Sequence, residues 1–534
     1  MNPRPRIVSL FCAFATLVWL CNPPASLAQK VTVSTYHNDN FRTGWNTGET
    51  KLTPANVGSS SFGVLGSVTL DDQVDAQPLV VPDQLITAGP HPGTHDVVYV
   101  ATEGNTVYAI DTNNGNILLS PNFGTPVSYP LGCGNNGPNV GINSTPVIDP
   151  VGKTMYVVIY TNELNGPVYR IHALDLGSLT DKVPPVVVTG SHTLTDGTTF
   201  KFNATYQRQR PALLMVNGNV YAGFGSFCDF AANLSRGWLL GWQLNSLTPL
   251  PANQVLDTLA SSPDDFFLSS IWMSGYGLAA DQAGDLYFVT GNSDYSGTTY
   301  NGVTNIQESV IRVSGDLTQV LDLFTPSDVS YLDQTDSDFG SGGALLLPPQ
   351  PGLIPNLVVA AGKDGNMYLM NRDDLGGFSL TNNNVLGTYN IGGCWCGQSY
   401  FVDPSDHTAR VVSSGGSTVS IWKVQIPSVK LPSVSLLNTA NSTTFSSGQD
   451  PGFFTSISSN QQANPIVWAL SRPFGPPYAV NLFAFDPEAG LKPLFRGQAG
   501  TWPNTGGNAN LAPVVANGKV FVASYKQLMA FGLK

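Results

Sequence analysis

Cysteine is the residue type whose placement could most directly carry chemistry in this chain. Cys394 and Cys396 flank Trp395, while Cys133 and Cys228 lie alone earlier in the sequence. Cysteines two residues apart can form a local disulfide or supply two thiolates to a metal, although a zinc site needs a second pair nearby. Three disulfide pairings are possible among these four cysteines. The sequence leaves disulfides, free buried thiols and a metal pair open.

Other familiar catalytic signals are weak or missing from the sequence. The six histidines are scattered, and His91 and His95 are four residues apart only within a Pro- and Gly-rich stretch, where no metal-binding helix is expected. The sequence contains no Gly-x-Ser-x-Gly elbow and no phosphate-binding loop. Adjacent acids such as Asp264 and Asp265 are typical of solvated turns. A pair of glycosidase carboxylates could also lie among them, because separation in sequence says little about separation in space.

The elements that must position any functional residue are short strands in a repeated pattern. Each copy has an apolar strand that ends in small residues, a turn, and a further strand that often closes on an acid and a glycine. The copies begin near Val97, Met155, Val220, Leu286, Leu357, Val411, Ile466 and Val520. Self-similarity at this period indicates one supersecondary unit per copy. The sequence therefore contains eight units.

Each unit is predicted to contain four strands. Candidate outer strands lie between the copies, at 255–259, 319–324, 385–389, 434–438 and 491–495. Four antiparallel strands make one blade of a β-propeller. The spacing of the copies exceeds what a minimal blade needs, and the excess lies in Gly-, Ser-, Asn- and Pro-rich loops such as 132–143, 293–305 and 439–460. Long loops on a rigid scaffold are common places for binding residues.

The two ends of the chain complement each other. The last unit, Ala512 to Lys534, has only three strands, and Phe62 to Leu70 has the pattern of the missing fourth. A strand borrowed from the other terminus closes a ring and leaves no exposed sheet edge. We therefore predict an all-β fold: an eight-bladed β-propeller of four-stranded antiparallel blades, closed by an N-terminal strand that completes the C-terminal blade.

The beginning of the chain has the features of an export signal. Arg4 and Arg6 precede an apolar run, and Ser26-Leu27-Ala28 offers small residues where a signal peptidase cleaves. We expect residues 1–28 to be a signal peptide and residues 29–534 to be the propeller domain, located in the periplasm or secreted. No later stretch approaches ~18 uninterrupted apolar residues, so no membrane span is expected.

Composition excludes one class of partner. Only 11% of residues are charged, while Gly and Pro number 55 and 39, which favours strands and turns over helices. Without the two arginines of the signal peptide the chain carries 22 basic and 36 acidic residues, a net charge of −14. This acidic balance makes nucleic acid an improbable ligand.

The blade pattern resembles the pyrroloquinoline quinone (PQQ) type propellers, the quinoprotein alcohol dehydrogenase-like family, over nearly all of the mature chain. The middle blades carry a closer likeness. Leu286 to Asn292 (LYFVTGN) resembles the strand with which these dehydrogenases present an asparagine to calcium, and 225–237 (GSFCDFAANLSRG) is similar to their loop with a ligand carboxylate. Residues 336–340 (DSDFG) fall where the family has its catalytic aspartate.

This resemblance implies a role for each matching residue. Asp229, Asn292 and Asp338 would bind calcium, and Asp338 would also be the catalytic base, with Asp336 as the alternative match. Lys363 would contact the carbonyl oxygens of the quinone, and Trp272 would support its flat face. Hard cations prefer such carboxylate and amide oxygens, and an indole face suits a planar ring system. The family has glutamate where this chain has the shorter Asp229.

The same residues also have simpler interpretations. Asn292 and Lys363 could form turns, Asp229, Asp336 and Asp338 could be loop acids, and Trp272 could be core. The chain departs from the family twice: none of its mature cysteines is adjacent to another, and Asp111 to Gly115 is not followed by the family's docking tryptophan.

Three functions follow from these interpretations. The first is a dehydrogenase that oxidises an alcohol or sugar with PQQ and calcium. Because the chain has no Cys-x-x-Cys-His haem motif, it would need a separate electron acceptor. The second is a non-catalytic propeller that binds a protein or carbohydrate partner. The third is a glycan lyase or hydrolase on the same scaffold.

Overall fold

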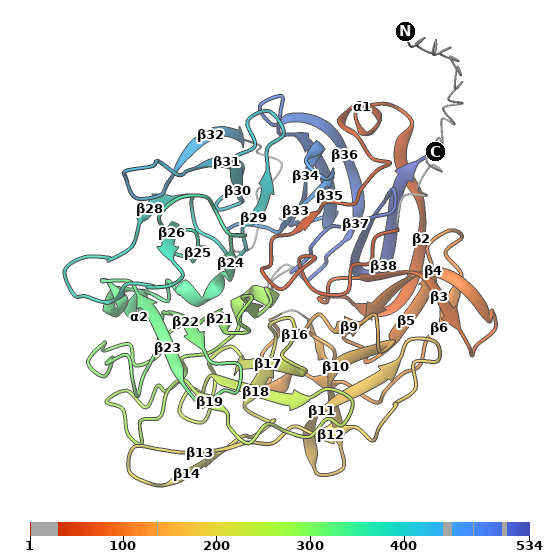
Figure 1. The fold of residues 1–534 in the computed structure, drawn as a ribbon. Coiled ribbons are helices and arrows are strands. Elements are labelled where there is room, and N and C mark those ends of the chain that lie inside the picture. Colours follow the sequence, from red (N-terminus) through yellow and green to blue (C-terminus); the bar gives the residue numbers. More distant parts are fainter. Residues whose placement is uncertain (2–29, 136, 442–450, 474, 505–509) are drawn as a thin grey trace.

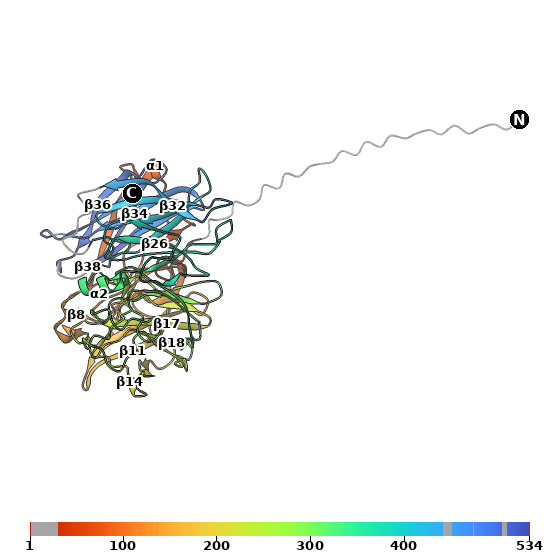
Figure 2. The same cartoon turned by 90° about the vertical axis from the view of Figure 1, so that its left-hand side faces the viewer.

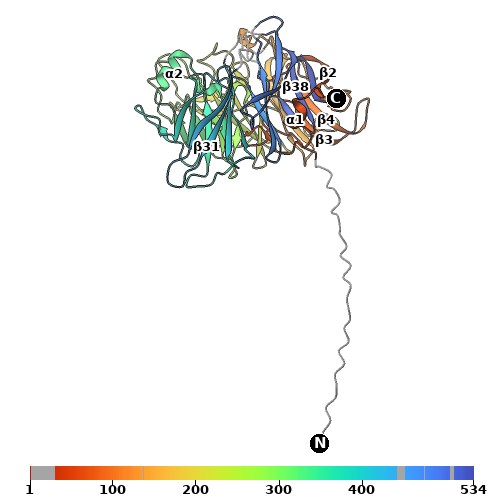
Figure 3. The same ribbon diagram turned by 90° about the horizontal axis from the view of Figure 1, so that it is seen from above.

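The fold is a ring of eight antiparallel sheets around a central axis. The computed structural model describes residues 1, 30–135, 137–441, 451–473, 475–504 and 510–534, and the predicted signal peptide lies outside this part of the chain apart from Met1. Figure 1 looks along the axis of the ring, and Figures 2 and 3 show from the side that it is thinner than it is wide. The predicted eight-bladed propeller is confirmed.

The first four blades follow each other in sequence. Blade 1 contains β3 (Leu79–Ile86), β4 (Gly93–Ala101), β5 (Val107–Asp111) and β6 (Ile117–Leu119). Blade 2 contains β9 (Val147–Asp149), β10 (Thr154–Glu163), β11 (Gly166–Asp175) and β12 (Val186–Val187). Blade 3 contains β15 (Gln207–Gln209), β16 (Leu214–Val216), β17 (Asn219–Ser226), β18 (Trp238–Gln243) and β19 (Gln254–Val255). Blade 4 contains β20 (Ala279–Ala280), β21 (Leu286–Val289), β22 (Val310–Val313), β23 (Val320–Thr325) and β27 (Gly377–Phe378).

The other four blades complete the ring. Blade 5 contains β24 (Ala344–Leu346), β25 (Leu357–Ala361), β26 (Asn366–Asn371) and β28 (Gly387–Asn390). Blade 6 contains β29 (Ser399–Val402), β30 (Ala409–Ser413), β31 (Thr418–Gln425) and β32 (Ser433–Asn441). Blade 7 contains β1 (Trp45–Asn46), β33 (Thr455–Asn460), β34 (Ala463–Ser471), β35 (Ala479–Asp486) and β36 (Lys492–Thr501). Blade 8 contains β2 (Phe62–Gln73), β37 (Val514–Ala516) and β38 (Lys519–Leu533).

A few short elements lie between the blades. They are two small ladders, β7 (Val127–Ser128) with β8 (Asn139–Val140) and β13 (Ser191–Thr193) with β14 (Thr199–Lys201), and the helices α1 (Pro54–Val57), α2 (Val329–Thr335), η1 (Pro130–Gly132), η2 (Met273–Gly275) and η3 (Phe339–Ser341). No helix in the described ranges is long and apolar enough to cross a membrane.

The middle strands of the blades are buried on both faces. Every residue of β25 is buried, as is every residue from Val97 to Ala101 in β4. Neighbouring blades cover both sides of each sheet, so these strands are continuous apolar runs instead of alternating ones. This is why the repeat is visible in the sequence. The predicted outer strands correspond to β19, β23, β28, β32 and β36.

Ring closure is as predicted. β2 pairs antiparallel with the end of β38, from Phe62 opposite Leu533 to Thr69 opposite Gln527, while the start of β38 pairs with β37. Lys526, with a φ of 57°, separates these two parts of β38. A Cβ on Gly532 would lie 3.0 Å from the carbonyl oxygen of Gly518, so the strand folds back beside its own start. Blade 8 therefore has the four-strand layout with strands from both ends of the chain.

A segment before β2 runs along the inside of the ring and contacts every blade in order (Figure 1). We call residues Val33–Asn46 the central belt. Its hydrogen bonds to the innermost strands of blades 1 to 8 join Val33 to Val80, Ser34 to Ile148, Asn40 to Met215 and Ala280, Phe41 to Leu346, Thr43 to Tyr400, Gly44 to Ile457, and Asn46 to Val515. The belt thus connects all eight blades in addition to the closing strand.

Arg42 fixes the middle of the central belt. Its side chain is fully buried, and its guanidinium donates hydrogen bonds to the carbonyl oxygens of Tyr36, Leu213 and Leu278 at 2.7, 3.1 and 2.7 Å. Burial lowers the pKa of this guanidinium to about 10. It remains charged at neutral pH, and its bonds tie the belt to blades 3 and 4.

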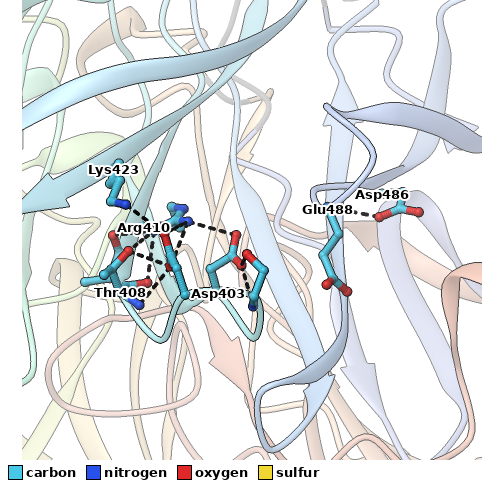
Figure 4. A network of polar contacts seen from close by, with 9 residues as sticks. Asp403, Thr408, Arg410, Lys423, Asp486 and Glu488 are labelled. Atoms are coloured by element: carbon cyan, nitrogen blue, oxygen red, sulfur yellow. Dashed lines mark hydrogen bonds and ion pairs between the residues drawn. The ribbon is translucent and has the colours of Figure 1, made fainter.

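Another charged cluster holds a turn of blade 6 (Figure 4). The buried Arg410 of β30 pairs with Asp403 and Asp406, and Lys423 of β31 lies 2.7 Å from Asp406. The turn joins the first two strands of its blade. Since a β-blade places the loops after strands 1 and 3 at one end and those after strands 2 and 4 at the other, this cluster and the candidate site described next lie at opposite ends of the ring.

Candidate functional site

The five residues proposed from the sequence lie in loops at one end of the ring. Asp229, Asn292 and Lys363 follow the second strands of blades 3, 4 and 5, in the loops after β17, β21 and β25. Trp272 and Asp338 lie in the connections from blade 3 to 4 and from blade 4 to 5. Three consecutive blades therefore aim these loops at the same region.

Four of the five residues border one cavity of about 190 Å³. Its lining residues are Asn135, Arg208, Arg210, Ser226, Cys228, Asp229, Trp272, Asp336, Asp338, Lys363 and Trp395. The wall combines three carboxylates, three cationic side chains and two indoles. This is a polar, ionic pocket in the middle of the site face.

Asn292 lies directly behind the cavity. Its backbone N–H donates to Oδ1 of Asp338 at 3.2 Å, and its side-chain amide donates to Oδ1 of Asp336 at 3.4 Å. Asn292 therefore belongs to the same cluster as the four lining residues, and it holds both aspartates in place.

Lys363 is the cationic centre of the cluster. Its Nζ lies 2.7 Å from Oδ2 of Asp338 and 3.0 Å from Oδ2 of Asp336. Burial would lower the pKa of the ammonium, but the two carboxylates outweigh this effect and raise the pKa above its ordinary value. Lys363 is therefore a fixed positive charge at neutral pH.

Asp229 has an altered titration. Its carboxylate accepts a hydrogen bond from the hydroxyl of Ser226. Burial raises the pKa of Asp229 to about 6, and the nearby negative charge of Asp338 acts in the same direction. A buried carboxylate close to a second one is a position that a cation would stabilise.

Two tryptophans form an aromatic corner beside Lys363. The rings of Trp272 and Trp395 have centroids 5.0 Å apart and planes inclined by 67°. Nζ of Lys363 lies 4.7 Å from the ring centre of Trp395, and the guanidinium carbon of Arg210 lies 5.1 Å from that of Trp272. Such contacts between cations and ring faces are favourable. A planar ligand on Trp272 would share this space with Arg210 and Trp395.

The structure adds site residues that sequence reasoning missed. Arg208 and Arg210 are two positions apart at β15, a spacing that puts both side chains on one face of a strand. Trp395 could have been found from the cysteines on either side of it. Glu308 left no signal: it is buried, has a φ of 48°, and accepts a hydrogen bond from the N–H of Phe339 at 2.6 Å, next to Asp338.

The cysteines form two disulfides, Cys133–Cys228 and Cys394–Cys396. Of the alternatives left open by the sequence, disulfides are therefore correct. The first bond joins loops that are 95 residues apart in the chain. Cys228 contributes to the cavity wall, and the second bond flanks Trp395.

The donor chemistry of the site fits a divalent cation next to an anionic planar ligand such as PQQ. Carboxylate and amide oxygens of Asp229, Asn292 and Asp338 are hard donors. Arg208, Arg210 and Lys363 are suited to ligand carboxylates and carbonyls, and Trp272 offers a ring face. Elsewhere in the described ranges no group of three or more His, Cys, Asp or Glu side chains is arranged to hold a metal ion; a set completed by an asparagine is a different case.

Comparison with known proteins supports the fold. No protein-family model and no curated protein sequence matches the chain. Among solved structures, the quinohemoprotein alcohol dehydrogenase from Comamonas testosteroni is similar with a TM-score of 0.62 and 12% identity, over 95% of this chain and 81% of that one. A quinohemoprotein alcohol dehydrogenase from Pseudomonas putida HK5 has a TM-score of 0.59 and 14% identity, over 94% and 80% of the two chains.

A third similar structure is a europium-containing methanol dehydrogenase. It has a TM-score of 0.57 and 12% identity, over 94% of this chain and 98% of that one. At such identities the likeness establishes the fold alone. The chain thus has the propeller fold seen in quinoprotein alcohol dehydrogenases.

Proposed function

We propose that this protein is an exported quinoprotein-type dehydrogenase that oxidises an alcohol or a sugar with PQQ and calcium. The observation that carries the proposal is the meeting of all five sequence-proposed residues at one ionic pocket. They come from separate loops over 135 residues of chain, so their convergence is not a consequence of neighbouring sequence positions. The names of the similar solved structures agree with this class of reaction.

Each residue has a role in this proposal. Asp229, Asn292 and Asp338 hold the calcium ion, Trp272 supports the planar cofactor, and Lys363 faces its carbonyl oxygens. When bound, PQQ with its calcium ion supplies an electrophilic quinone that accepts two electrons. Asp338 accepts the proton of the substrate hydroxyl as a general base. Lys363 and the backbone N–H of Asn292 orient that carboxylate.

Electrons would then pass to a separate acceptor, because the sequence has no haem attachment motif. Export of the chain, predicted from residues 1–28, would place the reaction in the periplasm or outside the cell.

The alternative is a non-catalytic propeller that binds a protein or carbohydrate partner. The size of the cavity favours it: about 190 Å³ is below the usual 300–1,000 Å³ of small-molecule pockets. The contacts of Trp272 with Trp395 and Arg210 also leave little free ring surface.

Reconstitution decides between the two. The mature chain is mixed with PQQ and calcium, and in a parallel series with PQQ and europium, and cofactor absorbance and dye reduction are followed over a panel of alcohols and sugars. We expect micromolar PQQ binding, which Trp272→Ala weakens, and turnover that Asp338→Asn lowers at least ~100-fold, the usual size of a general-base contribution. Asp316→Asn, in an exposed turn of blade 4 at the opposite end, is the matched control. Absence of PQQ binding at ~100 μM with either metal would discard the dehydrogenase in favour of the binding propeller.

A further inference from the structure

Both disulfides that the structure describes lie at the same pocket. Cys228 borders the cavity and Cys394–Cys396 flanks its lining residue Trp395. Over a ring of eight blades, cross-links that served general stability could lie anywhere between blades. Their common position points instead to a role at the site.

The loop that carries Asp229 has an unfavourable backbone conformation. Cys228 and Asp229 have φ values of 48° and 56°, so two consecutive residues with a Cβ occupy the left-handed region. Such residues persist only when their surroundings hold them. The loop runs from Phe227 to Gly237, with strands only at its two ends. It would relax to a commoner conformation if it were released.

The disulfide connects this loop to a rigid part of the molecule. Cys133 is 1% exposed and packs in one apolar cluster with Val127, Val140 and Phe227. Its backbone N–H donates to the carbonyl oxygen of Pro130 at 2.9 Å, at the end of η1. On the other side of the bond, the ring of Phe227 stacks on Tyr160 of blade 2 with a centroid distance of 5.9 Å. The sulfur of Cys228 is therefore anchored to blade 2.

We propose that the Cys133–Cys228 disulfide is the positioning element for Asp229: it fixes the backbone of residues 228 and 229 so that the carboxylate faces the cavity. The hydroxyl of Ser226 then completes the orientation of the side chain. In combination with the function proposed above, on which this part rests, the bond sets the affinity of the site for its cation. Cys133 and Cys228 are positioning residues and take no part in the chemistry.

A double-mutant cycle tests the link between the disulfide and Asp229. Terbium luminescence, excited through the nearby Trp272, reports cation affinity for the mature wild type, Cys133→Ser/Cys228→Ser, Asp229→Asn and the triple variant. We expect the double serine variant and Asp229→Asn each to bind terbium ~10-fold or more weakly. The triple variant should bind no more weakly than Asp229→Asn, because the disulfide acts through that carboxylate. Multiplicative losses would show that the bond affects the whole site and would overturn the proposal.

Hydrogen exchange tests the same tether without any ligand. Removal of Cys133–Cys228 should speed exchange of the amides of residues 226–236 at least ~10-fold and leave the amides of β17 and β18 unchanged, apart from Ser226. Cys394→Ser/Cys396→Ser removes the other pocket disulfide and is the matched control, with unchanged exchange in 226–236. If wild type binds no terbium but the exchange result is as expected, the metal site of the proposed function fails and the tether stands. Unchanged exchange in the double serine variant would overturn the tether itself.

Discussion

The ammonium of Lys363 lies 2.7 Å from Oδ2 of Asp338, and this ion pair joins two loops from different connections of the ring. The side chains of Lys363 and Asp338 are 13% and 4% exposed, so the pair is largely screened from water. Asp336 shares the same ammonium from an exposed position. The pair is thus both the centre of the candidate site and a structural contact between blades 4 and 5.

Loss of Lys363 should therefore destabilise the protein as well as the site. Lys363→Met leaves Asp338 as a buried carboxylate without a counter-charge, and we expect the free energy of unfolding to fall by about 3 kcal/mol, the usual cost of breaking a buried pair. Lys423→Met, which breaks a more exposed pair with Asp406, should cost less than about 1 kcal/mol. Urea unfolding at pH 7.5 measures both. Equal losses in the two variants would show that the Lys363 pair is no stronger than a surface contact.

Asp229 should make stability depend on pH in a defined window. Its pKa is about 6 in the folded protein against an ordinary 3.8, so the folded state holds this proton more tightly than the unfolded state. Its contribution to stability is then favourable at low pH and is lost as pH rises from about 4 to about 6. Asp229→Asn should stabilise the protein by roughly 1–3 kcal/mol at pH 7.5 and change it little at pH 4.

Thermal unfolding of Asp229→Asn and wild type at both pH values measures this effect. The turn variant Asp316→Asn should show no gain at pH 7.5. A stabilised Asp229→Asn that has lost cation binding would mark Asp229 as a residue kept for function at the expense of stability. If the variant is less stable than wild type at pH 7.5, the altered titration of Asp229 is wrong.

The fold could be predicted from the sequence because its signals are periodic. Buried middle strands such as Val97–Ala101 appear as apolar runs in every blade, and the closing strand at Phe62 has the same pattern as the others. The clustering of Asp229, Asn292 and Lys363 was predictable for the same reason, since each follows the second strand of its blade.

Other parts of the site could not be predicted because nothing periodic marks them. The pairing of Cys133 with Cys228 depends on the packing of two irregular loops, and spacing in sequence does not encode it. Trp395 and Glu308 reach the site from connections without strands. The central belt was also not foreseen: its contacts use backbone groups of Val33–Asn46, and these are independent of residue type.

The central belt should be needed for cooperative stability of the ring. Arg42→Met removes the donor for the carbonyl oxygens of Tyr36, Leu213 and Leu278 and leaves them buried. At roughly 1–3 kcal/mol for each unsatisfied group, we expect a loss of at least about 3 kcal/mol. The amides of Ala280, Leu346 and Tyr400, which donate to belt carbonyls, should exchange faster in this variant.

The matched control is Arg170→Met, which removes a half-exposed arginine paired with Glu163 at the hairpin of blade 2. It should cost less than about 1 kcal/mol and leave exchange at the belt unchanged. If exchange at Leu346 and Tyr400 is the same in Arg42→Met as in wild type, Arg42 does not hold the belt in place.

Ring closure should depend on Phe62, the first residue of the closing strand. Its side chain is 4% exposed and packs edge-on against Phe495 at a centroid distance of 4.9 Å, and against Trp468 at 5.7 Å, both from blade 7. Phe62→Ala removes a large buried ring at the point where the N-terminal strand meets the last two blades, so we expect a loss of about 3–5 kcal/mol. Leu65→Ala, three residues along the same strand but 43% exposed, should cost less than about 1 kcal/mol. Urea unfolding compares the two, and hydrogen exchange of Met529–Leu533 should rise in Phe62→Ala alone if β2 detaches from β38. Equal effects of the two substitutions on stability and on exchange would show that closure depends on the backbone ladder of β2 and β38 and not on this side chain.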